Sequence, residues 1–256
     1  MARPALKYAT MTFPDDPQLI GRIAPFQRLQ PAELQVVRQS AWLRRVEREA
    51  YFYYQGDPGR TFYILVEGQV KLTEVTAAGQ QILVRFVGPG DAMGIIAALS
   101  QAVYPLSAQA VDDCLALAWD GDILEQLMEQ YPRVAIDGLR LVSQRWHELE
   151  ERLRELATER VQRRIAQTLL RLVRQAGRQV ETGILIDLPL SRQDLAEMTG
   201  TTLYTVSRTL SQWEQQGLVE LGRERVLIRA PHGLTHLAED ILSQPPESPS
   251  GETAGQ

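Results

Sequence analysis

Two short polar runs near the C-terminus carry side-chain types that bind DNA phosphates and base edges. The first, Ser191-Arg192-Gln193-Asp194, is a helix start of the capping-box type, with aspartate in place of the usual Glu or Gln. Gly200 ends this helix, and Thr201-Thr202 can cap a second helix over residues 203 to about 215. Two short helices joined at a glycine-bearing turn predict a helix-turn-helix.

The side chains of the two expected helices separate into a buried and an exposed face. Hydroxyl groups and helix N-termini can bind phosphate oxygens, and an arginine can hold guanine by two hydrogen bonds in the major groove. The alternative is a helical hairpin whose arginine is only a solvated surface charge. The apolar residues expected to bury are Leu195, Val206, Leu210 and Trp213. The residues left to face outward are Thr202, Tyr204, Thr205, Ser207, Arg208 and Ser211.

A basic hairpin is expected after the second helix. Residues 218–221 and 225–229 predict a two-stranded wing around the turn Gly222-Arg223-Glu224, with Arg223 and Arg225 as its cations. Residues 159–236 hold eleven arginines and eight acidic residues, a net charge of +3, although the whole chain has −5. The capped helix pair, the threonine-rich helix start and the basic wing together favour binding to double-stranded DNA.

The rest of the chain must position this region. Its 256 residues allow one large or two medium domains, and 44% hydrophobic with 23% charged residues indicates a folded globular protein. The single cysteine, Cys114, excludes an internal disulfide, an iron–sulfur site of four cysteines and a zinc ribbon, and it favours a reducing cytoplasm. Residues 92–111 are uncharged and long enough to cross a bilayer, but their Gly, Pro, Ser and Gln residues argue against a membrane span.

The hydrophobic periodicity changes along the first half of the chain. Residues 26–48 have a helical pattern, with Pro31 placed at a first turn. From residue 51 to about residue 119, short β-type runs alternate with glycine turns, which predicts hairpins that close into a sandwich or barrel. The clearest of these runs are 62–66, 69–75 and 80–87.

A long helix is expected over residues 132–158. Its apolar residues recur at alternating intervals of four and three, which is the seam of a coiled coil. The alternative, a core helix of its own domain, would show a broader apolar face, so we expect a homodimer. The polar, proline-rich residues 243–256 predict a disordered tail. The seam residues are Ala135, Leu139, Val142, Trp146, Leu149, Leu153 and Leu156.

These residues, in this order, resemble the cyclic-AMP receptor protein/FNR superfamily of bacterial transcription regulators. Leu190-Ser191-Arg192-Gln193-Asp194-Leu195-Ala196 and Thr205-Val206-Ser207-Arg208 look like its helix-turn-helix, and Tyr54-Gln55-Gly56-Asp57 and Gly88-Pro89-Gly90-Asp91 look like its β-roll. The resemblance implies an α+β fold. Its expected parts are an N-terminal arm (1–25), a sensory β-roll of the jelly-roll-like double-stranded β-helix type (26–121), a helical dimerisation region (122–158), a winged helix-turn-helix (159–242) and the tail (243–256).

The resemblance also implies partners and residue roles. It implies a homodimer that binds an inverted-repeat DNA site and contacts RNA polymerase, with activation of transcription as the expected outcome. Family members often carry a glutamate three or four residues before the base-reading arginine, where Tyr204 stands here. The run 201–208 looks more like the branch that controls nitric-oxide and denitrification genes. By carry-over Arg208 would contact a base edge, and Arg192, Gln193, Thr201 and Thr202 would contact the backbone.

The expected effector site departs from that of cyclic-nucleotide binders in the family. Those proteins use a glutamate after the Gly-Asp turn for the ribose and an arginine-serine pair for the phosphate. Here the two places read Gly94-Ile95 and Tyr104-Pro105-Leu106-Ser107, and no basic residue lies between Arg85 and Arg133. We therefore expect a signal other than cyclic AMP; a cyclic-nucleotide-responsive regulator and a ligand-independent one are the alternatives. The apolar candidates for the pocket are Met93, Ile95, Leu99 and Leu106.

An apolar pocket of this kind can hold haem, which would suit a sensor of nitric oxide or redox state. The histidines are His147, His232 and His236, so none lies in the expected β-roll. His147 is the one near the pocket, and we expect it to be a surface histidine beside the seam. Cys114 and Met93 are weaker candidate ligands still.

Enzymes form the rival class. The glycines at 88, 90 and 94 have one residue too many for a dinucleotide-binding loop, and His147-Glu148-Leu149-Glu150-Glu151 is not the H-E-x-x-H of a zinc protease. The sequence has no Gly-x-Ser-x-Gly elbow and no cluster with metal-ligand spacing. We therefore expect neither catalysis nor a metal site. A regulatory module without DNA contact would keep the β-roll but lack residues 192–208.

Overall fold

The computed structural model describes residue 23 and residues 25–239. The expected disordered tail, and the expected N-terminal arm apart from residues 23 and 25, lie outside the described residues. The described chain divides into two compact units, which meet in the sequence between Leu153 and Arg154. Each unit combines helices with antiparallel sheet, as the α+β class requires.

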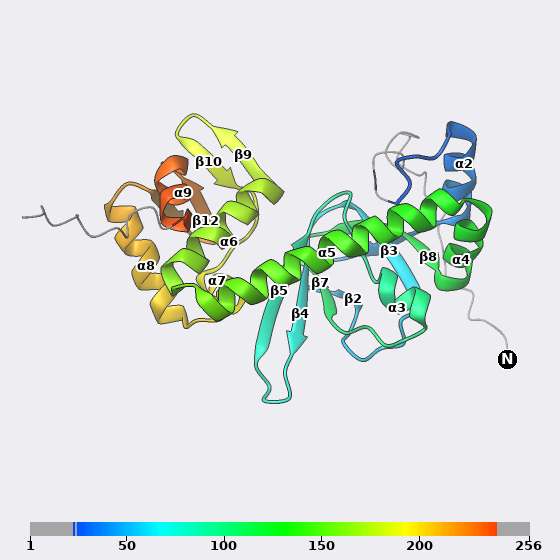
Figure 1. Ribbon diagram of the computed structural model, residues 1–256, viewed down its shortest axis with the longest axis horizontal. Helices are drawn as coiled ribbons and strands as arrows, with labels where there is room; N and C mark the ends of the chain where they lie inside the picture. Colours follow the sequence, from blue (N-terminus) through cyan, green and yellow to red (C-terminus); the bar gives the residue numbers. More distant parts are fainter. Residues whose placement is uncertain (1–22, 24, 240–256) are drawn as a thin grey trace, which may run out of the picture. The chain divides into compact units, whose positions relative to one another are not determined.

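The first unit contains two four-stranded antiparallel sheets with a hydrophobic core between them (Figure 1). The strand order is β1-β8-β3-β6 in one sheet and β2-β7-β4-β5 in the other. This arrangement confirms the expected jelly-roll-like β-roll. The strands are β1 (Trp42–Val46), β2 (Tyr51–Tyr53), β3 (Thr61–Glu67), β4 (Val70–Val75), β5 (Gln81–Val87), β6 (Ala92–Met93), β7 (Ser107–Ala110) and β8 (Cys114–Asp120).

The central strands β3 and β8 are covered on both faces. Along β3, Phe62 and Ile64 pack in a core beneath the helices, whereas Tyr63 and Leu65 pack in the core between the sheets. Side chains of a strand alternate between its two faces. In a strand that is covered on both faces, no side chain in the middle of the strand meets water, so these positions are all apolar. This double burial explains why β3 and β8 read as continuous apolar runs.

The helices of the first unit lie against the outer face of the sheet that contains β3 and β8 (Figure 1). Phe26 and Trp119 join the two layers, with ring centroids 5.4 Å apart, and Trp119 Nε1 donates to Val37 O at 3.1 Å. A buried indole N–H requires such a partner, so this contact fixes the layer. The helices are α2 (Pro31–Ser40), α3 (Ile95–Ser100), α4 (Gly121–Gln130) and α5 (Pro132–Thr158).

The helix predicted over residues 26–48 is confirmed only for Pro31–Ser40; it is wrong before Pro31 and beyond Ser40. The chain from Trp42 to Val46 forms β1, which pairs antiparallel with β8, so that Trp42 lies opposite Ala118. This pairing joins segments about 70 residues apart, and local periodicity cannot reveal it. The uncharged stretch 92–111 is divided among β6, α3 and β7, and no helix in the described part of the chain is long and apolar enough to cross a membrane.

The second unit places its helices beside one antiparallel sheet of order β11-β12-β10-β9. β11 and β12 form the hairpin expected as the wing, whereas the sequence patterns do not predict β9, β10 and α9. Leu190 N donates to Glu224 O at 3.1 Å, which fixes the wing turn to the segment before α7. The elements are α6 (Val161–Ala176), β9 (Gly177–Val180), β10 (Gly183–Ile186), α7 (Arg192–Thr199), α8 (Leu203–Gln215), β11 (Val219–Gly222), β12 (Arg225–Ile228) and α9 (Pro231–Glu239).

Candidate functional site

Both expected helix starts of the helix-turn-helix are present, at α7 and α8. Ser191 Oγ accepts from Asp194 N at 3.0 Å, and Asp194 Oδ2 accepts from Ser191 N at 2.8 Å, so the capping box is complete. Gly200 ends α7 in the left-handed conformation, with φ of 59°. Thr202 Oγ1 then accepts from Thr205 N at 3.2 Å and caps α8.

The helix pair buries its apolar side chains and leaves one face of α8 open. Tyr204 is 73% exposed, and helical spacing puts it on the same side as Arg208. The buried residues are the four expected ones: Leu195, Val206, Leu210 and Trp213. Of the expected DNA contacts, the exposed ones are Arg192, Gln193, Thr202, Tyr204 and Arg208, and the half-buried ones are Thr201, Thr205 and Ser207.

Some of the expected contact groups also bond within the protein. Gln193 Nε2 donates to Glu197 Oε1 at 3.1 Å, and the hydroxyls of Thr202 and Thr205 lie 2.9 Å apart. An amide and a hydroxyl each keep further hydrogen-bonding capacity after one such contact. These residues can still bind phosphate, and Thr202 also caps the start of α8.

Apart from Arg164, the arginines of the second unit divide into two groups. One group forms ion pairs within the unit: Arg163, Arg171, Arg178 and Arg229. In the part of the chain that the structure describes, the other group makes no hydrogen bond or ion pair, so its guanidinium groups are available to a ligand. This second group includes every arginine expected at DNA: Arg192, Arg208, Arg223 and Arg225, all of them exposed.

Arg164, which no local sequence pattern singles out, holds the turn between α7 and α8. From α6, its Nε donates to Thr199 O at 3.0 Å and its Nη2 donates to Gly200 O at 3.4 Å. Carbonyls at a helix end have no partner within the helix, and a cation there also suits the helix dipole. Arg164 is therefore a positioning residue. The carbonyls of Thr199 and Gly200 lie 35 residues or more away in the sequence, so only the folded chain brings them to Arg164.

The last turn of α5 also contacts this part of the second unit. Glu155 accepts from Arg171 Nη1 at 2.6 Å through Oε1, which joins α5 to α6. Leu156, expected in the dimer seam, lies so close to Gly200 that a Cβ there would be 3.1 Å from Leu156 Cδ2. These two contacts hold the last turn of α5 within the second unit.

Gly200→Ala should destabilise the protein by about 2 kcal/mol, because a left-handed alanine is strained and its Cβ would also press on Leu156. Gly217→Ala is the matched control, since Gly217 has φ of 71°, and apart from its two chain neighbours no described residue lies within 4 Å of the added Cβ. This control should lose only about 1 kcal/mol, for the backbone strain alone. Urea denaturation measures both; equal losses would show that the contact with Leu156 has no energetic effect.

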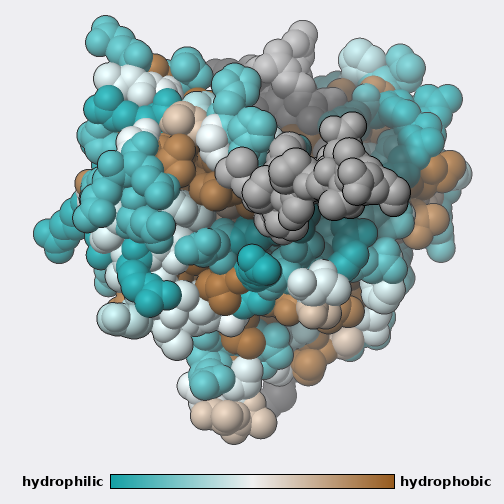
Figure 2. All heavy atoms as spheres, turned by 60° about the vertical axis from the view of Figure 1, so that its left-hand side comes forward, coloured by the Kyte–Doolittle hydropathy of each residue, from teal (hydrophilic) through white to brown (hydrophobic). Residues whose placement is uncertain are grey.

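One stripe of α5 exposes large apolar side chains. Most of the expected seam is exposed in the single chain, with Leu139 at 70% and Leu153 at 69%; Val142 is half-buried. On the face drawn in Figure 2, hydrophilic side chains predominate, and hydrophobic ones lie in small groups between them. A stripe of exposed leucines with heptad spacing needs a partner helix. The other exposed seam residues are Trp146, Leu149 and Leu156.

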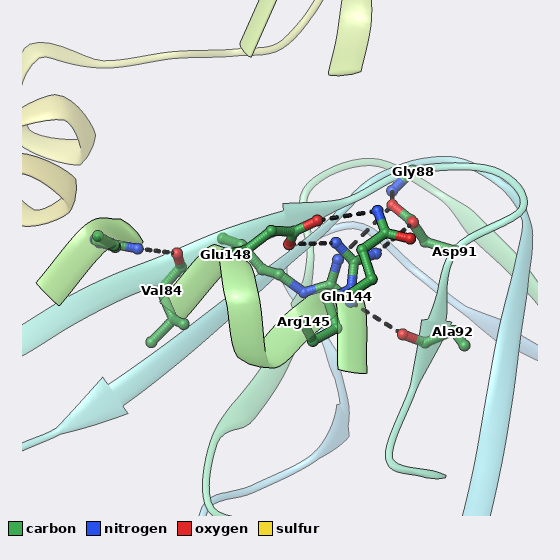
Figure 3. A network of polar contacts seen from close by, with 9 residues as sticks. Val84, Gly88, Asp91, Ala92, Gln144, Arg145 and Glu148 are labelled. Atoms are coloured by element: carbon green, nitrogen blue, oxygen red, sulfur yellow. Dashed lines mark hydrogen bonds and ion pairs between the residues drawn. The ribbon is translucent and has the colours of Figure 1, made fainter. Parts of the chain in front are cut away.

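A network of charged side chains joins α5 to the β-roll (Figure 3). Arg145 Nη2 donates to Asp91 Oδ1 at 3.0 Å, and Arg145 Nη1 donates to Glu148 Oε2 at 2.7 Å. Asp91 Oδ2 lies 3.9 Å from Arg85 Nη1, so one carboxylate faces two guanidinium groups. The turn that carries Asp91 is thereby tied to the middle of α5.

Arg85 is engaged in this network and is not free for a ligand. Its Nη2 donates to Ala92 O at 3.0 Å. Burial lowers the pKa of Arg85, and the charge of Arg145 lowers it further, whereas Asp91 acts in the opposite direction. The guanidinium thus has its partners within the protein. It does not supply the cation that an effector phosphate would need.

Two polar residues of the expected effector segment are also engaged. Tyr104 stacks on Tyr53 with ring centroids 3.8 Å apart, and its hydroxyl donates to Thr61 O at 2.6 Å. Burial raises the pKa of Tyr104 to about 12, so its hydroxyl stays neutral. Ser107 Oγ accepts from Gln55 N at 2.9 Å. Neither side chain can neutralise a phosphate.

The four apolar residues expected to line an effector pocket lie in two different cores. Met93 and Leu106 pack between the sheets, whereas Ile95 and Leu99 pack beneath the helices. Gly94, with φ of 80°, turns the chain between β6 and α3 and so sends its neighbours to opposite sides. The structure therefore does not bring the four side chains together.

The candidate haem ligands do not form a haem site. The side chain of His147 is 73% exposed, and its Nδ1 lies 3.4 Å from Glu150 Oε2. Burial raises the pKa of Cys114 to about 12, so the thiol is not the thiolate that iron prefers, and Met93 lies in the core. Among the described residues, no group of His, Cys, Asp and Glu side chains could hold a metal ion.

Comparison with known proteins gives matches in both units. Residues 43–131 match the cyclic nucleotide-binding domain, and residues 163–237 match the Crp-like helix-turn-helix domain. The cyclic AMP receptor protein of Thermus thermophilus is 30% identical over 83% of this chain and 95% of its own length. The global nitrogen regulator of Nostoc is 30% identical over 72% and 84%. The structure of FixK2 from Bradyrhizobium japonicum aligns with a TM-score of 0.68 at 26% identity, over 77% of this chain and 96% of that one.

Proposed function

We infer the function from one premise: this chain belongs to the Crp/Fnr family of DNA-binding transcription regulators. Regulators of this family act as dimers. We propose that two copies of this chain join along the exposed seam of α5 and that each places α8 in the major groove of one DNA half-site. A symmetric dimer of this kind reads an inverted repeat.

The proposed DNA contacts rest on one observation: α7, α8 and the wing carry exposed arginines that make no hydrogen bond or ion pair within the described part of the chain. Arg208 lies on the open face of α8 and would read a base edge, whereas Arg192, Arg223 and Arg225 would bind phosphates. Gln193, Thr201, Thr202, Thr205 and Ser207 would support the backbone contacts, and Tyr204 would face the groove. An electrophoretic mobility shift on promoter fragments tests this function: a specific competitor should remove the shift, and mixed-sequence DNA should not.

We also propose that the signal at the β-roll is not cyclic AMP. One relative at 30% identity is a cyclic AMP receptor protein, and another at 30% identity is a global nitrogen regulator. The names of these two relatives therefore do not point to a single signal. In this chain Leu106 stands where cyclic-nucleotide binders have the phosphate-binding arginine, and Arg85 is engaged with Asp91. A buried phosphate without a cation is costly, which favours a neutral or apolar effector, or a redox or nitric-oxide signal.

Isothermal titration of the dimer with cyclic AMP should give no binding heat at micromolar ligand. The reason is that neither the ribose-binding glutamate nor the phosphate-binding arginine is present at residues 94–95 and 106–107. The control is a cyclic-AMP-binding relative measured in the same buffer. A dissociation constant in the micromolar range would contradict the proposed effector class.

We also propose that this regulator acts in the cytoplasm, meets RNA polymerase at the promoter and activates transcription. The run Thr201-Thr202-Leu203-Tyr204-Thr205-Val206-Ser207-Arg208 resembles the nitric-oxide and denitrification branch of the family, so we propose genes of that class as targets. Chromatin immunoprecipitation with sequencing would identify the regulated genes.

A further inference from the structure

Three residues of α5 that contact other parts of the first unit are seven residues apart. A Cβ on Gly138 would lie 3.5 Å from Met128 Cε on α4 and 4.0 Å from Ile95 Cδ1 on α3. Arg145 pairs with Asp91 at 3.0 Å, and Arg152 Nη1 donates to Val84 O at 2.5 Å. In the heptad fixed by the seam, Leu139, Trp146 and Leu153 are a positions. The three contact residues each precede one of them and are therefore g positions. One flank of the seam thus faces the β-roll of its own chain.

The opposite flank of the seam is exposed in the described part of the chain. Its e positions include Ile136, which is 48% exposed, and Glu150, whose side chain is 59% exposed. The contact that the structure gives for Glu150 is with His147, one turn away on the same helix. An exposed isoleucine and a carboxylate beside a dimer seam are placed to meet the partner helix.

The dimer of the proposed function requires parallel α5 helices. The DNA-binding unit begins at Arg154, near the C-terminal end of α5. The two C-terminal ends must lie together if both units are to reach one DNA site. In a parallel pair, each g residue faces the e residue that lies five positions further along the partner helix. Arg145 at g and Glu150 at e are five residues apart and carry opposite charges.

We propose that Arg145 of each protomer pairs with Glu150 of the partner subunit, so that the partner's carboxylate completes the cluster of Arg85, Asp91 and Arg145. Arg145 has room for this contact, since its side chain is 30% exposed. A guanidinium has five N–H donors, and the hydrogen bonds to Asp91 and Glu148 use two of them.

The cluster already contains two carboxylates, since Asp91 and Glu148 both act on its two guanidinium groups, and a carboxylate of the partner would join it beside Arg145. Asp91 is shared by Arg85 and Arg145, and the repulsion between these two cations adds to the lowering of the pKa of Arg85. A partner carboxylate beside Arg145 would offset part of this repulsion. The turn that ends in Asp91 would then contact the α5 helices of both protomers. A conformational change at one β-roll would then act directly on α5 of the partner subunit. This inference rests on the homodimer of the proposed function.

A pair of charge-reversed variants tests the contact. Glu150→Arg alone would set Arg145 against a partner arginine, and Arg145→Glu alone would set two glutamates against each other. When the two variants are mixed, both cross-pairs of a heterodimer are attractive. Native mass spectrometry should therefore find more than about 80% heterodimer, because both homodimers are repelled. Defects within each chain are the same in homodimers and heterodimers, and they do not bias this ratio.

The matched control replaces Glu150→Arg by Glu151→Arg, which adds the same charge at an f position away from the partner. This mixture should show the statistical half of heterodimer. A statistical distribution in both mixtures would overturn the proposed contact. Wild-type protein that forms no dimer at micromolar concentration would instead overturn the homodimer of the proposed function.

A milder pair of variants covers the case in which Arg145→Glu disturbs the fold. Glu150→Gln should raise the dimer dissociation constant about fivefold at low salt, and less at high salt, because two ion pairs are lost. Glu151→Gln should leave it unchanged. Sedimentation equilibrium measures both constants; equal values for the two variants would count against the contact.

Discussion

Leu149→Asp should convert the dimer to a monomer and remove sequence-specific DNA binding. Leu149 is 54% exposed in the single chain and lies at a d position in the middle of the seam. In the dimer, two aspartates would replace two leucines that pack together, and each would lose water without gaining a partner. The dimer dissociation constant should rise at least about 100-fold, since both lost packing and charge burial contribute.

Sedimentation velocity at micromolar concentration measures this change, and circular dichroism checks that the chain remains folded. Val103→Asp is the control, because Val103 is as exposed as Leu149, at 56%, but lies between α3 and β7 and pairs with Pro58. It should remain a dimer. If Leu149→Asp kept the wild-type sedimentation coefficient and bound DNA normally, α5 would not be the dimer interface.

Arg208→Ala should weaken binding to the specific site by about 1–3 kcal/mol, which is roughly 10- to 100-fold. The loss should be confined to the specific site, because a base contact carries sequence discrimination whereas a phosphate contact does not. Fluorescence anisotropy with the specific site and with a scrambled duplex measures both affinities.

The control for this variant is Arg178→Ala. Arg178 is also an exposed arginine of the second unit, but its Nε donates to Asp187 Oδ2 at 3.0 Å. An arginine already paired within the protein should contribute little to DNA affinity. An equal loss on specific and scrambled DNA for Arg208→Ala would make Arg208 a phosphate contact and not a base-reading residue.

The parts of the site that the sequence predicts are those that depend on neighbours in the chain. The caps at Ser191 and Thr202, and the turn at Gly200, involve hydrogen bonds over three to five residues, so local patterns are sufficient. The same holds for the heptad stripe of α5, which the structure leaves exposed as the pattern requires.

The parts that the sequence does not predict depend on distant contacts. Local periodicity predicts helix at β1, because the partner strand that makes it a strand, β8, lies about 70 residues later. Arg164 and Arg145 look like solvated charges on helices, and their roles become visible only when Gly200 O and Asp91 are placed beside them. The four apolar residues expected to line one effector pocket are separated for a related reason. Gly94 turns the chain between Met93 and Ile95 and sends these side chains into different cores, which the apolar composition of the segment does not reveal.

The DNA site itself tests the central claim most directly. Selection of bound duplexes from a random pool, followed by sequencing, gives the site without any assumption about the target genes. A homodimer that places one α8 in each half-site should enrich an inverted repeat whose half-site centres lie about 34 Å, or one helical turn, apart. Enrichment of a single unpaired motif, or of no motif at all, would contradict a dimeric sequence-specific regulator.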